Sequence, residues 1–469
     1  MSAAGGAWYP ARLMANPPSP RDASSLDQAW SLVLGGRRDE GLRRCVALLE
    51  ADPLQLGAAS LAVELLIAAE RPAVAREVAA RLVEAYLRRS DLPAATAAAR
   101  LVLSDAGAPK GAAKPLYASI AKAFGKGSAR LADVPPAPPP LPVPAPVEGP
   151  LAKLAGTALL DRTEAALQAL LAADDPFDAD GKVTQLPLFS ALPPKALEQL
   201  LAAFTLRDLP EGALAITQGD EGREAFVVVR GALSVRKGVQ SEGAEGTRDE
   251  AAADVLAVLG PGAIFGEMAL VSDAPRAASV VALEPVQLLV ASREALEAIA
   301  QTEAAVGKEL SAFCRNRMMA NLVRHSAILN AVAPAQRDDL MARFETRTFQ
   351  PGDTLTQQDQ DADGLFLIAS GQVRVTGVDA DGDKLVLAEL GPGDVVGEIS
   401  LVLRRPATAT VTASHPTIAL HLPRQQFQEA IREHATLLQE LYELATKREE
   451  ETRSVVAQQA LDVGDIVLV

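Results

Sequence analysis

An internal repeat constrains this chain more than any other feature. The stretch LPLFSALPPKALEQLLAAF, which begins at Leu186, and the stretch SAILNAVAPAQRDDLMARF, which begins at Ser326, are each followed by the same series of landmarks. In the first copy these are Gly212, Phe226, Gly231, GPG at 260–262 and GE at 266–267; in the second they are Gly352, Phe366, Gly371, GPG at 391–393 and GE at 397–398. Two copies of one fold therefore follow each other.

The spacing of the landmarks locates an insertion in the first copy. The offset between the copies is 140 residues as far as Gly231 and Gly371, and 131 residues from GPG onwards. The first copy thus holds nine extra residues between these landmarks. We expect them in the polar tract GVQSEGAEGTRDEAAAD from Gly238, as an extended hairpin at the surface.

Each copy has the pattern of a β domain. Short apolar runs, such as AFVVVRGALSVR from Ala225 and LFLIASGQVRVTG from Leu365, are broken by Gly and Asp at turn spacing. This pattern predicts antiparallel strands that close into a barrel or jelly roll. Helical stretches lie between and after the copies, so the expected fold class is α+β with several domains.

The N-terminal third shows helical periodicity without a strong signature. The segments RDEGLRRC at 38 and ERPAVARE at 70 begin alike, about 32 residues apart, which resembles a tetratricopeptide period. Paired helices in any alanine-rich bundle would give the same signal, so both interpretations stay open. In either case, residues 25–130 offer a docking surface for a protein partner whose identity the sequence does not give.

A proline-rich stretch follows the helical region. VPPAPPPLPVPAPVEGP from Val134 predicts an extended polyproline II spacer that separates the helices from the rest. A PxxP ligand for an SH3-like partner is the alternative. The expected organisation is a disordered leader at 1–24, helices at 25–130, a linker at 131–150, a helical connector at 151–185, the first β domain at 186–302, a connecting helix at 303–325, the second β domain at 326–430, and a C-terminal helix and tail at 431–469.

Charge and cysteine content exclude several classes of function. The net charge of -15 disfavours binding to nucleic acid or to anionic membrane surfaces. Cys45 and Cys314 are too few and too far apart for a disulfide framework or a cysteine metal site. The N-terminus lacks a signal-peptide core, and no run is long and apolar enough to span a membrane. We expect a cytoplasmic protein.

One segment carries a specific chemical pattern. Residues 265–280 read FGEMALVSDAPRAASV. This resembles the phosphate-binding cassette of cyclic-nucleotide-binding domains, in which FGE-L/I-AL precedes PRAA-T/S. The resemblance extends over both copies, about 245 residues from Leu186 to near Ala430, and their tandem order is similar to the regulatory subunit of cAMP-dependent protein kinase.

The residues of this cassette suit an anionic ribonucleotide. A helical turn after Gly266 would present free N–H groups to a phosphate, and glycine allows a close approach. Arg276 would neutralise the phosphate with a planar fork of donors, whereas the anionic Glu267 would accept a hydrogen bond from the ribose 2′-OH. By themselves, a Glu and an Arg nine residues apart would indicate no more than a surface ion pair. The complete cassette is what favours ligand binding.

The resemblance also implies that the amides of Ala269 and Ala277 reach the phosphate. Ala277 stands where cGMP-selective members tend to carry Thr or Ser, so cAMP is expected before cGMP. No metal or cofactor is implied. The predicted ligand residues are Gly266, Glu267, Met268, Ala269, Leu270, Arg276, Ala277 and Ser279.

The second copy departs from the cassette at its most important residue. Residues 396–411 read VGEISLVLRRPATATV, with Ala407 in the place of the arginine. Losing one charge-assisted contact of roughly 1.5 to 3 kcal/mol would weaken binding about ten- to a hundredfold or more. Arg404 and Arg405 either swing in or are solvated turn residues. A weak site in this degenerate copy would use Gly397, Glu398, Ile399, Ser400 and Thr408.

The nucleobase of a bound ligand would need a lid. In this family an apolar or aromatic group from a following helix often supplies it, so Phe313 or Met318 is a candidate for the first site and Tyr442 for the second. At helical spacing, the same residues are also typical of a core or an interface.

No catalytic signature appears in the chain. Walker, GxSxG, HExxH and CxxC motifs are absent, and the four histidines lack metal-ligand spacing. His325 and His434 fall on predicted helices, and His415 and His421 fall near a strand. A basic helix-turn-helix is also absent after the second copy, so DNA binding is not expected. We interpret the protein as a non-enzyme.

The sequence leaves three hypotheses for its output. In the preferred one, cAMP at the first copy repositions the helix at 303–325, and the protein is a ligand-switched adaptor. In the second, both β domains are constitutive protein-interaction scaffolds. The third is a kinase-inhibiting subunit, for which the near match to a substrate-like segment is Arg88, Arg89 and Ser90, followed by Asp91.

Overall fold

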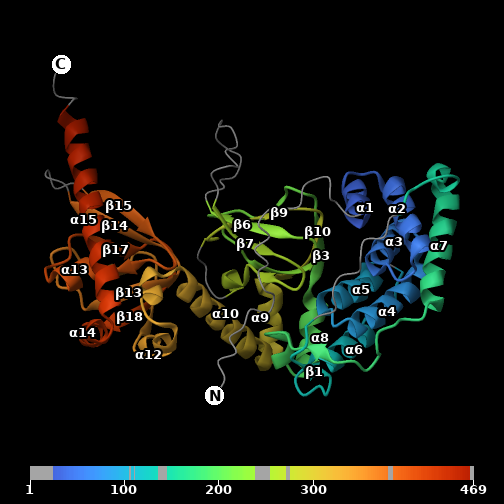
Figure 1. Ribbon diagram of the computed structural model, residues 1–469, viewed down its shortest axis with the longest axis horizontal. Helices are drawn as coiled ribbons and strands as arrows, with labels where there is room; N and C mark the ends of the chain where they lie inside the picture. Colours follow the sequence, from blue (N-terminus) through green and yellow to red (C-terminus); the bar gives the residue numbers. More distant parts are fainter. Residues whose placement is uncertain are drawn as a thin grey trace. The chain divides into compact units, whose positions relative to one another are not determined.

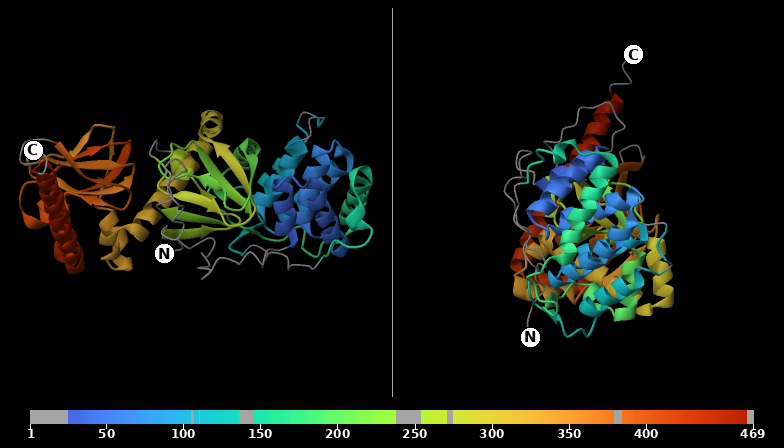
Figure 2. Two further views of the ribbon diagram at one scale, coloured as in Figure 1. Left: turned by 90° about the horizontal axis from the view of Figure 1, so that it is seen from above. Right: turned by 90° about the vertical axis from the view of Figure 1, so that its right-hand side faces the viewer.

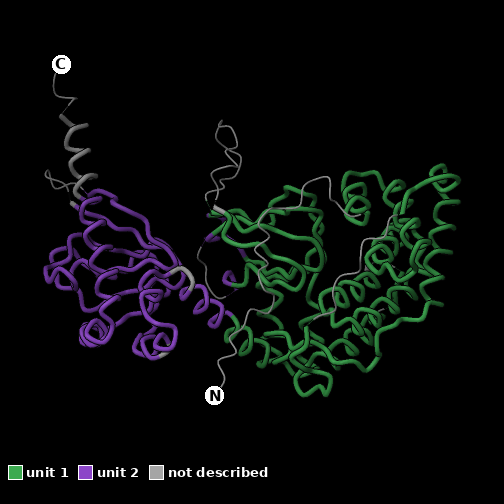
Figure 3. The backbone as a smooth tube through the Cα atoms, in the orientation of Figure 1, with its two compact units in different colours: residues 1–218, 223–267, 278–313 green, residues 219–222, 268–277, 314–469 purple. Residues whose placement is uncertain are grey.

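The computed structural model describes residues 25–104, 107–109, 111–135, 145–237, 254–270, 275–378 and 384–464. The chain divides into two compact units (Figure 3). The first unit comprises residues 1–218, 223–267 and 278–313, and the second comprises 219–222, 268–277 and 314–469. The first unit thus holds the N-terminal helices and most of the first β domain, and the second holds the second β domain with two short segments of the first.

The N-terminal helices pack in sequence order, each against the next (Figure 1). Alanine residues at 0 to 1% exposure, such as Ala59, Ala62 and Ala95, line their contacts, because a methyl side chain lets helices approach closely. Whether this array is of the tetratricopeptide type stays a prediction. Its helices are α1 (Ser25–Leu34), α2 (Arg38–Ala51), α3 (Leu56–Ala68), α4 (Pro72–Arg88), α5 (Leu92–Ser104) and α6 (Lys114–Phe124).

Helix α7 (Gly156–Ala172), which follows the proline-rich stretch, packs back against α2 and α4 (Figure 2). Its buried face includes Leu159, Leu167 and Leu170. Arg71, the residue before α4, donates hydrogen bonds to the carboxylates of Asp161 and Glu164 on α7. The parallel strands β1 (Leu131–Ala132) and β2 (Val183–Thr184) add a second connection. This packing differs from the expected separation of the two segments, because the apolar face of α7 is buried on the array. The 3-10 turn η2 (Leu151–Lys153) precedes it.

The first β domain consists of two four-stranded sheets, in the orders β3-β10-β5-β8 and β4-β9-β6-β7. All of its registered strand pairs are antiparallel. Its elements are η3 (Phe189–Ala191), α8 (Pro194–Ala203), β3 (Thr205–Leu209), β4 (Leu214–Ile216), β5 (Glu224–Arg230), β6 (Leu233–Lys237), β7 (Asp254–Leu259), β8 (Ile264–Phe265), η5 (Glu267–Leu270), β9 (Ser279–Ala282), β10 (Val286–Ser292) and α9 (Arg293–Thr302).

The second β domain repeats this topology, with the sheets β11-β18-β13-β16 and β12-β17-β14-β15. The shared strand order confirms that the two copies have one fold. Its elements are α10 (Ala304–His325), α11 (Ala327–Asn330), η6 (Pro334–Gln336), α12 (Arg337–Met341), β11 (Glu345–Phe349), β12 (Thr354–Thr356), β13 (Gly364–Ser370), β14 (Val373–Val378), β15 (Lys384–Leu390), β16 (Val395–Val396), α13 (Glu398–Leu403), β17 (Thr410–Ala413), β18 (Thr417–Pro423), α14 (Arg424–Glu433) and α15 (Ala435–Gly464).

In both β domains the two sheets enclose an apolar core, as in a jelly roll rather than a single closed barrel. The core of the first includes Phe226 and Leu288, and that of the second includes Phe366 and Ile368. Alternation of side chains along each strand directs one set inward and the other outward. The predicted insertion falls between β6 and β7, where residues 238–253 lie outside the described part of the chain.

The N-terminal helices contact the first β domain through Arg230, the last residue of β5. Its guanidinium pairs with Asp27 of α1, lies 5.0 Å from the centre of the buried Trp30 ring, and donates to Pro285 O at 2.8 Å. Helix α5 also packs against β3 and β5. The helical array and most of the first β domain therefore belong to one compact unit.

Candidate functional site

The first cassette begins where strand β8 ends. Phe265 pairs with Phe226 of β5, and their rings stack with centroids 4.9 Å apart. The next residue, Gly266, has φ +74°, a conformation that side chains other than glycine disfavour. A short 3-10 turn then starts at Glu267. Gly266 therefore allows the change of chain direction between the end of β8 and the start of the 3-10 turn.

Two of the predicted ligand residues in this turn are buried. Glu267 is 5% exposed and Ala269 is 4% exposed. The boundary between the two compact units falls directly after Glu267. Met268, which is grouped with the second unit, packs against a buried cluster that includes Met318 and Leu322.

Arg276 lies in the loop before β9, and its backbone is held by two hydrogen bonds. Its N–H donates to Asp220 O at 2.9 Å, and its carbonyl accepts from Gly219 N at 2.9 Å. Its guanidinium packs against Gly222, in the space that a side chain at this position would fill. A methyl group built on Gly222 would lie only 1.9 Å from Arg276 Nε and 2.2 Å from Cζ. The sequence analysis did not identify Gly222.

Ala277 and Ser279, the last predicted ligand residues, differ in their surroundings. Ala277 is exposed, whereas Ser279 is fully buried. Ser279 Oγ accepts a hydrogen bond from Gln218 N at 2.9 Å, which ties β9 to the segment after β4. Ser279 therefore has a structural bond in addition to its predicted role. Leu270 ends the 3-10 turn, and residues 271–274 lie outside the described ranges.

The second cassette has the same backbone start. Gly397 has φ +90°, and a methyl group on it would lie 2.7 Å from Gly364 O. Helix α13 begins at Glu398, whose carboxylate is buried and accepts from Arg448 of α15 at 2.8 Å. Arg448 also donates to Val395 O at 2.5 Å. Glu398 is thus neutralised by a residue of its own domain.

The backbone around Ala407 repeats that around Arg276. Ala407 N donates to Gln360 O at 2.9 Å, and its carbonyl accepts from Asp359 N at 2.9 Å. Gln360 and Asp359 occupy the places of Asp220 and Gly219 in the repeat. The second β domain therefore keeps the backbone frame of the arginine position, while the 6% exposed methyl group of Ala407 replaces the guanidinium.

Ser400 and Arg405 of the second cassette make bonds within the chain. Ser400 Oγ accepts from Ala362 N at 3.2 Å and donates to Arg405 O at 2.7 Å. Arg405 Nη2 forms an ion pair with Glu449 at 2.7 Å, so this residue is not the solvated turn residue expected. Arg404 is exposed, as expected for a turn, with φ +53°. Ile399 and Thr408 are partly buried.

The proposed lids occupy different environments. Met318 is 9% exposed and belongs to the buried cluster of the second unit, the alternative that helical spacing allowed. Tyr442 is 55% exposed, and Phe313 is partly buried. None of these positions provides independent support for a lid.

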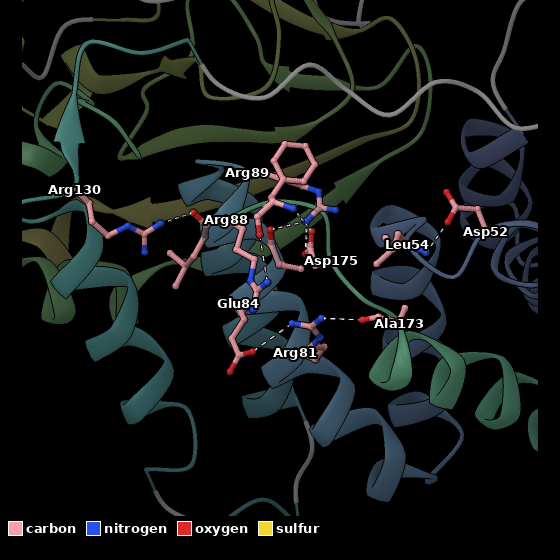
Figure 4. Close-up of polar contacts among 12 residues, drawn as sticks. Asp52, Leu54, Arg81, Glu84, Arg88, Arg89, Arg130, Ala173 and Asp175 are labelled. Carbon is pink, nitrogen blue, oxygen red and sulfur yellow. Dashed lines mark hydrogen bonds and ion pairs between the residues drawn. The ribbon is translucent and has the colours of Figure 1, made fainter. Parts of the chain in front are cut away.

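The substrate-like segment of the kinase-inhibitor hypothesis lies inside the fold. Ser90 is 8% exposed and exchanges hydrogen bonds with Thr184, at 2.9 Å to its Oγ1 and 2.6 Å from its N. Arg89 donates to Asp175 at 2.7 Å, and Arg88 donates to Phe177 O (Figure 4). These hydrogen bonds connect the C-terminal end of α4 to the segment that follows α7. Ser90 is therefore not accessible as a substrate-like serine in this structure.

Groups that could indicate other chemistry do not converge. Among the residues the structure describes, no three His, Cys, Asp or Glu side chains are placed to hold a metal ion. His325 ends α10, His434 follows α14, and His421 lies on β18, in agreement with the sequence pattern. Across the described ranges, no helix has the length and apolar character needed to cross a bilayer.

Comparison with known families identifies the β domains. Residues 206–303 and 346–434 both match the family model of the cyclic nucleotide-binding domain. The matched ranges contain both cassettes and the strands of the two repeated β domains, apart from the first residues of β3 and β11. The chain therefore contains two cyclic-nucleotide-binding domains in tandem.

Several known proteins are similar to about half of the chain. The cAMP-dependent protein kinase regulatory subunit of Yarrowia lipolytica is 29% identical over 245 residues, covering 52% of this chain and 58% of that protein. The type II regulatory subunit of Drosophila melanogaster is 27% identical over 241 residues, covering 51% and 57%. The chain thus spans less than two thirds of the length of these relatives. Over about half of its length, the chain is related to the regulatory subunits of cAMP-dependent protein kinases.

A solved structure is also similar to part of the chain. The regulatory domain of Toxoplasma gondii PKA, crystallised with cAMP, is 24% identical, covers 55% of this chain and 92% of its own, and gives a TM-score of 0.26. A score this low does not establish a shared overall arrangement.

Proposed function

We propose that this protein is a cyclic-nucleotide receptor with one competent site, in the first β domain. Arg276 would donate to the cyclic phosphate, and Glu267 would accept from the ribose 2′-OH. The amides of Ala269 and Ala277 would complete the phosphate contacts. The match of residues 206–303 to the cyclic nucleotide-binding family supports this proposal.

The placement of Arg276 is the observation that carries the proposal. Its backbone is fixed by Asp220 and Gly219, and its guanidinium lies against Gly222. A cation fixed before the ligand arrives loses less side-chain entropy on binding. A guanidinium can donate several charge-assisted hydrogen bonds to an anion, so this placement favours an anionic ligand.

We infer a preference for cAMP over cGMP from Ala277. A hydroxyl at this position could hydrogen-bond the guanine, and alanine has none. Calorimetric titration with both nucleotides should give tighter binding of cAMP. Replacing Ala277→Thr should narrow the ratio of the two dissociation constants by roughly two- to tenfold, the value of one neutral hydrogen bond.

The proposed output is a ligand-dependent change in α10 that regulates a protein partner on residues 25–130. Met268 supports this route, because the cassette residue packs against the cluster that holds Met318 and Leu322 of α10. A switch requires that cAMP bind two conformations with different affinity. Hydrogen exchange should therefore change over residues 304–325 when cAMP is added to the wild type. The same addition to Arg276→Ala should leave these amides unchanged.

A constitutive scaffold is the alternative from another class. The second β domain favours it locally, because Ala407 replaces the arginine and Glu398 is paired with Arg448. A ligand that binds the folded state raises the melting temperature in proportion to the logarithm of its concentration. The receptor predicts such a rise with cAMP, whereas no rise at millimolar cAMP would favour the scaffold.

A further inference from the structure

Gly222 provides the space that Arg276 occupies. A side-chain methyl at this position would lie 1.9 to 2.3 Å from Nε, Cζ and Nη2 of Arg276. Carbon and nitrogen atoms that are not bonded to each other normally approach no closer than about 3.5 Å, so the guanidinium would have to move by roughly 1.5 Å. Gly222 does not have a positive φ, so alanine would fit its backbone. The steric conflict is therefore confined to the arginine side chain.

In the second β domain, both residues of this pair are replaced. Ala362 occupies the place of Gly222 in the repeat, and Ala407 occupies the place of Arg276. The backbone bonds of Ala407 to Gln360 and Asp359 are those of Arg276 to Asp220 and Gly219. The two domains thus differ at a pair of positions within an otherwise similar frame.

Ala362 lies against the start of the second cassette. It is 4% exposed, and its N–H donates to Ser400 Oγ at 3.2 Å. A methyl group built on Gly397 would lie 3.7 Å from Ala362 Cβ. The methyl group of Ala362 therefore lies beside the cassette glycine. By the correspondence with Gly222 and Arg276, an arginine at 407 would place its guanidinium in this region.

We infer that Gly222 is a positioning residue for the nucleotide phosphate, and that the residue at this place decides whether a β domain of this chain can use a cassette arginine. This inference rests on the proposed function. Because Gly222 has no side chain, the guanidinium of Arg276 can occupy the space beside it. Ala362 closes the equivalent space, so an arginine at 407 alone does not rebuild the second site.

The first test compares cAMP affinity by calorimetry in the full chain. Gly222→Ala should weaken binding at least about tenfold through the displaced charge-assisted contact, with the ligand-free melting temperature unchanged. Gly260→Ala is the matched control, because no atom lies within 4 Å of its added methyl group and its φ is ordinary. It should bind cAMP as the wild type does.

The outcomes of this test separate the two proposals. If the wild type does not bind cAMP, the proposed function fails and the inference fails with it. If the wild type binds and Arg276→Ala does not, but Gly222→Ala binds like the wild type, only the inference is wrong. A drop in melting temperature equal to that of a core substitution would assign Gly222 a structural role instead.

The second test adds the arginine to the second domain in the Arg276→Ala background. Ala407→Arg combined with Ala362→Gly should bind cAMP at least about tenfold more tightly than Ala407→Arg alone. Equal behaviour of the two variants, whether both bind or neither does, would show that position 362 does not decide the use of the arginine.

Discussion

The two β domains share the backbone at the arginine position but differ in the side chains that fill it. Arg276 and Ala407 make corresponding hydrogen bonds to the loop after the second strand of their domains. Gly222 leaves room for a guanidinium, and Ala362 occupies the equivalent place. Under the proposed function, these two positions would distinguish the competent site from the degenerate one, although both domains have the same fold.

The second domain also shows how a cassette carboxylate is accommodated without a cassette arginine. Glu398 is buried and accepts a hydrogen bond of 2.8 Å from Arg448 on α15. Arg405 forms an ion pair with Glu449 on the same helix. A buried charge requires a partner, because desolvation is costly. The C-terminal helix supplies that partner, and it thereby links α13 to α15.

The largest effect that we predict concerns this link. Arg448→Met should leave Glu398 buried and unpaired, and it should destabilise α13 by about 3 to 5 kcal/mol. Hydrogen exchange of the α13 amides measures the loss. Lys447→Met is the control, because Lys447 pairs with Glu451 at a highly exposed site and should cost less than about 1 kcal/mol. Similar exchange in the two variants would contradict a stabilising role for Arg448.

A somewhat smaller effect is expected at the ribose contact. Glu267→Gln keeps the shape of the side chain but removes its charge, and it should weaken cAMP binding about ten- to a hundredfold. Binding of 2′-deoxy-cAMP, which lacks the hydroxyl, should be weak in the wild type and change little. Glu398→Gln should not affect the first site. Equal weakening of both nucleotides by Glu267→Gln would reject the assigned contact.

A third prediction concerns pH and the first unit. Burial, with added repulsion from Asp208 of β3, raises the pKa of Glu64 on α3 to about 7, and Arg38 opposes this shift. The folded state then binds more protons than the unfolded state, so stability is lost as pH rises through 7. The slope should reach at most about 1.4 kcal/mol per pH unit.

Glu64→Gln tests this prediction. In chemical unfolding between pH 5 and 8, the wild-type first unit should become less stable as pH rises, and the variant should show a flatter profile. Parallel profiles would mean that Glu64 does not carry the dependence. Asp208, whose pKa burial also raises, would then be the next residue to replace.

The smallest predicted effect is a pH dependence of the stability of the second β domain, opposite in sign to that of Glu64. Burial lowers the pKa of His421 on β18, although Asp363, 3.3 Å away, partly offsets this. Arg347 and Glu345 also act on this group. The folded state binds fewer protons, so stability is lost as pH falls through about 6.5. Hydrogen exchange of β18 should accelerate at pH 6 in the wild type but not in His421→Gln.

The repeat and the cassette could be predicted from sequence because their signals are local. Landmark glycines, apolar runs and the FGE segment keep their spacing along the chain, and the structure confirms the two matching domains. The packing of α7 could not be predicted from the proline-rich stretch before it. An apolar stripe at Leu159, Leu167 and Leu170 was the available signal for a buried face.

Contacts between distant segments were the other part that sequence reasoning missed. Gly222 and Arg276 meet only because the loops after β4 and before β9 are hydrogen-bonded together. The repeat shows that Ala362 and Ala407 replace both residues in the second copy. The sequence alone does not show that the two positions are in contact, so the two replacements could not be connected. Arg448 was equally unrecognised, because a charged residue on a long helix is typical of a solvated face.

Calorimetric titration of cAMP into the wild type and Arg276→Ala tests the central claim most directly. The account predicts a binding isotherm with one site per chain for the wild type, and a loss of affinity of at least about tenfold for the variant. Two sites per chain in the wild type, or equal heats for both proteins, would contradict it.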